Sequence, residues 1–102
     1  MVAINLQNDI NADFNYTFEV FDRNGCTPFD FTGYVFSGVL YDFFGNLVAA
    51  PVIVTNIGNA ISIEIAANSV TYCPAIYTLI INGSDGLNLL NLANIKIAYF
   101  KI

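Results

Sequence analysis

The chain offers few residues that could do chemistry, and none of them is histidine. Without histidine, Ser-His-Asp, Cys-His and histidine–metal sites are excluded. Glu19 and Glu64 remain as a candidate carboxylate pair of the kind that hydrolyses glycosidic bonds. Each glutamate, however, takes a polar position in an alternating apolar–polar segment, which favours a charge that faces solvent. We therefore expect no catalytic residues and no enzyme.

The two cysteines, Cys26 and Cys73, lie far apart in the sequence and form no CxxC motif. Their spacing is compatible with two separate thiols and also with a disulfide, because pairing cannot be deduced from sequence alone. Both alternatives stay open.

Oxygen-bearing side chains gather in the segments that we expect to be turns. Such loops can bind Ca²⁺, but the spaced acidic pattern of an EF-hand loop is absent. Aspartate and asparagine are also the usual turn-forming residues. We therefore expect no metal and no cofactor. The residues in question are Asp22, Asn24, Asp42, Asn46, Asn82, Ser84 and Asp85.

The composition is poor in charge and rich in apolar residues. Charged residues make up 11% of the 102 residues, hydrophobic residues make up 56%, and the net charge is −5. An average domain carries about 25% charged residues. We infer that other molecules cover a large part of the folded surface.

Two kinds of partner are not expected. The only cationic residues are Arg23, Lys96 and Lys101, so the chain lacks the basic stripe that binds nucleic acid. The longest apolar run, Leu47–Val54, is far shorter than the roughly 20 residues of a membrane-spanning helix. We therefore expect neither a nucleic acid nor a membrane as partner.

Alternating segments predict an all-β fold in a single domain over residues 1–102. Phe14–Val20 and Ile61–Ile65 alternate with period two, as half-buried strands do. Further short apolar segments are separated by Gly- and Asn-rich turns. We expect a single antiparallel β-sandwich, Ig-like or jelly-roll-like, of about seven short strands.

The remaining elements follow from local composition. Pro51 cannot donate to a ladder, so its strand should lie at an edge or carry a bulge. One short helical turn is expected near residues 66–72, before Pro74. A bulge, or a break between two strands, is expected around Asn94. The strands expected in addition are Phe29–Thr32 at an edge, Tyr34–Asp42, Leu47–Thr55, Tyr77–Ile81 and Leu87–Ile102, with turns at 56–59 and 82–86.

One stretch of the sequence carries a family resemblance. It runs as Phe18-Glu19-Val20-Phe21-Asp22, Arg23-Asn24-Gly25-Cys26-Thr27-Pro28, Phe29-Asp30-Phe31-Thr32-Gly33-Tyr34, Val35-Phe36-Ser37-Gly38 and Gly45-Asn46-Leu47-Val48. This order resembles small β-sandwich proteins of tailed bacteriophages, such as the N-terminal domain of baseplate upper proteins and related fibre-attachment modules. The resemblance implies a structural protein of the virion, assembled in the host cytoplasm, without catalytic residues.

Two placements in the virion and one other function remain open. A fibre connector is usually followed by a fibre in the same chain, so a lone domain favours a capsid cement protein, often trimeric, that clamps neighbouring coat subunits. A baseplate, neck or tail-fibre connector is the alternative. A carbohydrate-binding receptor module is an alternative of another class, and it predicts a cleft with exposed Tyr or Phe beside Asn and Asp. The expected interface residues are Pro51, Ile53, Leu87, Leu89, Leu90, Leu92, Ile95, Ile97, Phe100 and Ile102.

Overall fold

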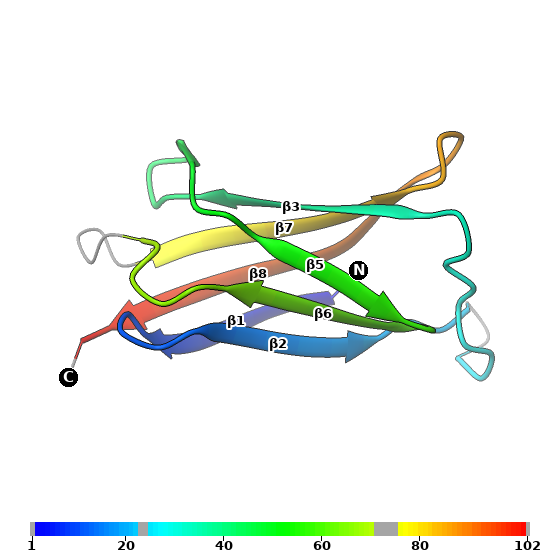
Figure 1. The fold of residues 1–102 in the computed structure, drawn as a ribbon, viewed down its shortest axis with the longest axis horizontal. Helices are drawn as coiled ribbons and strands as arrows, with labels where there is room; N and C mark the ends of the chain where they lie inside the picture. The colour runs from blue at the N-terminus through cyan, green and yellow to red at the C-terminus, as the bar shows by residue number, and fades with distance from the viewer. Residues whose placement is uncertain (1, 23–24, 71–75, 102) are drawn as a thin grey trace.

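The protein is all-β. A computed structural model describes residues 2–22, 25–70 and 76–101, and these residues form eight strands and no helix (Figure 1). The molecule measures 41 × 24 × 19 Å along its principal axes. The strands are β1 (Val2–Asp9), β2 (Phe14–Glu19), β3 (Val35–Tyr41), β4 (Leu47–Val48), β5 (Ile53–Ile57), β6 (Ala60–Ile65), β7 (Ile76–Ser84) and β8 (Leu89–Phe100).

The strands form two sheets. The larger sheet has the order β1-β8-β7-β3-β4, and the smaller sheet has the order β2-β6-β5. All pairs are antiparallel except β1 and β8, which run parallel. In Figure 1 the smaller sheet lies in front of the larger one, and the strands of both follow the long axis.

One apolar core lies between the two sheets. Alternate residues of β7 and β8, such as Leu79, Ile81 and Ile95, are fully buried. From the smaller sheet, Ile61 and Ile63 belong to the same cluster. Period-two alternation puts these side chains on one face of each sheet, so burying them requires the sheets to pack together.

The backbones approach closely where β3 passes β5. A Cβ atom at Gly38 would lie 2.5 Å from Cγ1 of Val52 and 3.1 Å from Cγ2 of Val54. Only glycine leaves room for these valines at this point. The close approach therefore fixes the spacing of the two sheets at this edge.

The segment Leu47–Thr55 was expected to be one strand, and this expectation was wrong. Its first two residues form β4 in the larger sheet, and β5 begins at Ile53 in the smaller sheet. Pro51 lies between the two strands, outside any ladder. Because proline has no N–H to donate, the chain leaves one sheet and enters the other at this residue.

Several other expectations also need correction. Residues 29–32 form a loop and turn instead of a strand, and the described residues 66–70 form turns instead of a helix. Residues 71 and 72 lie outside the described part. Of the two alternatives around Asn94, the bulge is confirmed, since Ile81 pairs with Ala93 but Asn82 pairs with Asn91, and β8 continues through Asn94 without a break. The structure has eight strands instead of about seven, with β1 not foreseen.

Substitution of Gly38 tests the close approach of the sheets. We expect Gly38→Ala to lower the free energy of unfolding by about 1–3 kcal/mol, because the new methyl group overlaps Val52. The neighbouring Ser37 is exposed, so Ser37→Ala should change it by less than about 0.5 kcal/mol. Urea unfolding of the three proteins measures both effects. Equal stability of the two variants would contradict this account of the packing.

The buried tyrosines at the other end of the core predict a loss of stability at high pH. Tyr99 packs edge-to-face on Tyr77 at 5.6 Å, and burial, reinforced by Tyr77, raises the pKa of Tyr99 from 10.0 to about 12. The unfolded chain therefore loses this proton first, so the free energy of unfolding should fall as the pH rises from 10 towards 12. Tyr99→Phe should weaken this fall relative to the wild type. Urea unfolding across this pH range gives the comparison, and an identical slope for the variant and the wild type would refute it.

Candidate functional site

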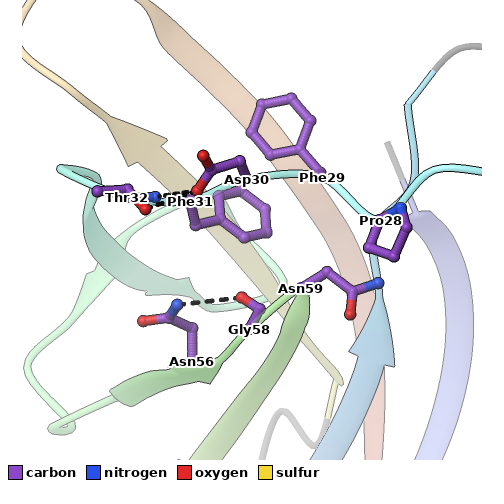
Figure 2. Close-up of a pocket in the computed structure, with 8 residues that line it drawn as sticks. All are labelled: Pro28, Phe29, Asp30, Phe31, Thr32, Asn56, Gly58 and Asn59. Carbon is purple, nitrogen blue, oxygen red and sulfur yellow. Dashed lines mark hydrogen bonds between the residues drawn. The ribbon is translucent and has the colours of Figure 1, made fainter.

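A pocket of about 350 Å³ opens between the loop before β3 and the turn that joins β5 to β6. Figure 2 shows its two walls, one from each segment. These segments lie far apart in sequence and meet at one end of the two sheets (Figure 1). The lining residues are Pro28, Phe29, Asp30, Phe31, Thr32, Asn56, Gly58 and Asn59.

Asp30 shapes the first wall. Its Oδ1 accepts hydrogen bonds from the Thr32 hydroxyl at 2.6 Å and from the Thr32 N–H at 2.9 Å. These two bonds stabilise the charged carboxylate and lower its pKa. An aspartate bonded to the backbone two residues on forms an Asx turn, which reverses the chain before β3. The carboxylate therefore remains ionised at the rim of the pocket.

Aromatic packing anchors this wall to the core. Phe31 is buried, and its ring centroid lies 4.7 Å from that of Phe29 and 5.2 Å from that of Phe36. In Figure 2 the Phe31 ring points towards the β5–β6 turn, while the Phe29 ring points away from it. The loop is therefore held to the core by its aromatic side chains.

The second wall is held by amides. Asn59 donates its Nδ2–H to the Val20 carbonyl at 2.9 Å, and its backbone carbonyl accepts the Val20 N–H at 3.0 Å. Asn56 donates from Nδ2 to the Gly58 carbonyl at 3.3 Å. Gly58 has a φ of 58°, which a side chain would disfavour. The turn therefore has a defined shape, in which the Nδ2 groups of both asparagines donate to backbone carbonyls.

The pocket is lined by polar and aromatic side chains. A carboxylate, a hydroxyl and two amides stand beside an aromatic ring, which is the arrangement that orients a polar ligand by hydrogen bonds. The described residues include no group of three His, Cys, Asp or Glu side chains that could hold a metal ion. The candidate turn residues Asp42 and Asp85 direct their Oδ1 atoms to backbone N–H groups of their own turns.

The structure separates the two glutamates that could have formed a carboxylate pair. Both are exposed on the outer face of the smaller sheet. Glu19 pairs with Ala60 and Glu64 with Asn15, so they lie four residues apart along the ladder. At about 3.3 Å per residue this is roughly 13 Å. Of the cysteines, Cys26 is exposed, and Cys73 lies outside the described residues.

Exposed apolar side chains form a second candidate surface at the end where the β7–β8 hairpin lies. Leu87 at the hairpin tip is 93% exposed, Leu89 is 73% exposed and Val35 is 75% exposed. Ser84 pairs with Val35 on one side and with Leu89 on the other, so the three strands present one continuous row. We call Val35, Leu87 and Leu89 the hairpin patch. The opposite end exposes Phe43, Phe44 and Leu47 around the β3–β4 turn.

The expected interface residues divide between surface and core. Leu92, Ile95 and Ile97 lie in the core and are not accessible to a partner, because β8 is a central strand of the larger sheet. Leu90 is half-buried, and Ile102 lies outside the described residues. The exposed ones are Pro51, Ile53, Leu87, Leu89 and Phe100.

Some exposed apolar residues were not foreseen, namely Val35, Phe43, Phe44 and Leu47. A signal existed for the last three, because they flank the Gly45 turn, and residues at a turn tip project into solvent. In the described part of the chain, no helix is long and apolar enough to cross a membrane.

No protein-family model matches the chain, and no curated protein matches it.

Proposed function

We propose that this protein is a non-enzymatic structural protein of a tailed-phage virion, built as a β-sandwich of the Ig-like or jelly-roll-like kind. The observation that carries the proposal is the hairpin patch, an apolar surface at one end of an elongated molecule. The strand and turn order of residues 18–48, which resembles phage fibre-attachment modules, supports the choice of a virion. The protein acts mechanically, by joining neighbouring subunits.

The exposed area supports an assembling protein. A compact monomer of this mass would expose about 5,700 Å², whereas this chain exposes 6270 Å². Full burial of a leucine side chain contributes about 1.5–3 kcal/mol, so Leu87 and Leu89 can contribute substantially to a contact. The loss of translational and rotational freedom on association offsets part of that free energy. In a symmetric shell every subunit makes the same contact, so the contacts together reinforce the shell.

Within the virion, we propose a capsid cement protein that forms trimers between coat subunits, with a baseplate, neck or tail-fibre connector as the alternative. Both roles need an exposed apolar element that reaches a neighbour. The β7–β8 hairpin extends beyond the rest of the larger sheet (Figure 1) and supplies one. Copy number separates the roles, since a capsid carries hundreds of cement copies and a tail carries far fewer.

Substitution at the hairpin tests the mechanical role. The double variant Leu87→Asp, Leu89→Asp should lose its place in particles, because two carboxylates cannot be buried without partners. Leu47→Asp is the matched control, since Leu47 is 70% exposed at the opposite end, and we expect it to be retained. Quantitative mass spectrometry of purified particles of the encoding phage gives copies per virion. A wild-type protein absent from those particles would refute the proposal.

These point substitutions are preferable to removal of residues 87–102. Strand β8 lies between β1 and β7, and its side chains fill the core. Its removal would unfold the domain and would say nothing about assembly.

The pocket favours a second candidate function, a carbohydrate-binding receptor module. Asp30, Asn56 and Asn59 line the pocket as expected for that class, but Phe29 is half-buried and Phe31 is buried, so the pocket lacks the exposed ring that was expected. Sugars present many hydroxyl groups, and carboxylate and amide oxygens accept hydrogen bonds from them.

A glycan array with the isolated protein tests this second function. Binding should be at least tenfold weaker for Asn56→Ala, which removes one amide of the wall, and unchanged for Asn15→Ala on β2. Asn15 is exposed and lies outside the lining of this pocket. Absence of any glycan signal for the wild-type protein would exclude the candidate.

A further inference from the structure

Strand β1 leaves one of its two edges open. It pairs with β8 on one side only, and it ends the five-stranded sheet. Figure 1 shows it along the lower margin of that sheet. An open edge presents a row of backbone N–H and C=O groups that can template a further strand.

The other three edge strands are short or interrupted, and β1 is not. Strand β4 has two residues, and β5 has five and follows Pro51. Strand β2 has six residues and ends at the charged Glu19. Strand β1 has eight residues, Val2–Asp9, with no proline and no charge before Asp9. Natural edge strands usually carry charges, prolines or bulges that prevent pairing, and β1 has none of these along seven residues.

The side chains of β1 alternate in a way that suits pairing. Ala3, Asn5 and Gln7 are exposed on the outer face of the sheet. Ile4 and Leu6 face the core beside Ile95 and Ile97 of β8. Their partners in β8 are fully buried, but Ile4 and Leu6 are only half-buried. The core is therefore incompletely closed along this edge.

We propose that β1 pairs antiparallel with β1 of a second copy about a two-fold axis at Asn5. In this register Asn5 faces its own symmetry mate, Ala3 faces Gln7, and Ile4 faces Leu6 of the other copy. Residues on the same face stay on the same face, so Ile4 and Leu6 close the core while Ala3, Asn5 and Gln7 remain on the outer face. The two five-stranded sheets become one continuous sheet.

Two observations favour a second copy over an unrelated strand. A two-fold axis at Asn5 sets Ile4 opposite Leu6 of the second copy, so the two half-buried apolar residues of β1 cover each other across the axis. The paired residues carry no charge, so two molecules of net charge −5 meet here without a like-charge contact. On the order of six backbone hydrogen bonds would form across the axis.

The contact is compatible with the proposed trimer but does not rest on it. Single subunits joined through β1 form a dimer, and trimers joined through β1 form a hexamer. The number of subunits is even in both cases.

Disulfide trapping tests the register. In the proposed pairing the Cα atoms of Asn5 and its mate lie about 4.5–5.5 Å apart, within the range that a disulfide spans. Asn5→Cys should therefore give a covalent dimer under mild oxidation. Gln7→Cys is the matched control, because position 7 and its mate are offset by four residues, roughly 13 Å. The wild-type chain reports any background from Cys26 and Cys73. Equal cross-linking of both variants would overturn the register.

Light scattering after size exclusion tests the contact itself. We expect the wild-type protein to have an even number of subunits and Asn5→Lys to have half that number, because two lysines would oppose each other on the axis. Asn15→Lys places the same exposed substitution on the β2 edge and should leave the mass unchanged. Circular dichroism confirms that each variant is folded. A wild-type monomer or trimer, or an Asn5→Lys protein of unchanged mass, would overturn the proposal, even if the protein is found in virions.

Discussion

The structure depends on a core between two sheets that admits only apolar side chains. No residue with a polar or charged classification is buried in the described part of the chain. Ile61 and Ile63 of the smaller sheet belong to the same cluster as Leu79 and Ile95 of the larger one. A charged group in this space would lose its hydration without a partner, at a cost of several kcal/mol. Each polar group must therefore lie at the surface or be satisfied within a ladder or turn.

The carboxylates meet this constraint by closing turns. Asp42 accepts the backbone N–H of Phe44 at 2.9 Å, and Asp85 accepts that of Leu87 at 2.9 Å. In each turn the residue whose N–H is bonded exposes its apolar side chain, by 72% at Phe44 and 93% at Leu87. The charge of the turn is thus directed inward to the backbone while an apolar group stands at the tip. This arrangement explains how a chain with a few charges can close its hairpins and still present apolar ends.

Much of the fold could be predicted from the sequence, because half-buried strands alternate with period two. The segments Phe14–Val20 and Ile61–Ile65 alternate clearly, and both are strands close to the expected bounds. The change of sheet at Pro51 was harder to foresee, because a run of apolar residues on both sides of proline fits a bulged strand equally well. Strand β1 also escaped notice, since it pairs in parallel with β8, the last strand of the chain, and no local signal reports a contact of that range.

The candidate sites were less predictable than the fold, for a physical reason. The pocket joins residues 28–32 to the turn at 56–59, and their proximity depends on the packing of the sheets. Interface residues in β8 were misassigned because apolar residues occupy both alternating sets of positions in this strand. The sequence therefore does not indicate which set faces the core. The bulge beside Ile81 interrupts the alternation of buried and exposed positions in β8, so that two consecutive residues, Leu92 and Ala93, are both buried.

The scarcity of charge leaves two different kinds of surface. At the hairpin patch, contact depends on apolar side chains and so on the shape of the partner. Along β1, contact depends on backbone hydrogen bonds, whose geometry is the same in every strand. The side chains need only be uncharged, with apolar residues opposite apolar residues on the core-facing side. A lysine in β1 would cost the fold little but would block the approach of another strand. The length of this strand together with its lack of charge, and not its apolar content, is therefore what distinguishes it from the other edges.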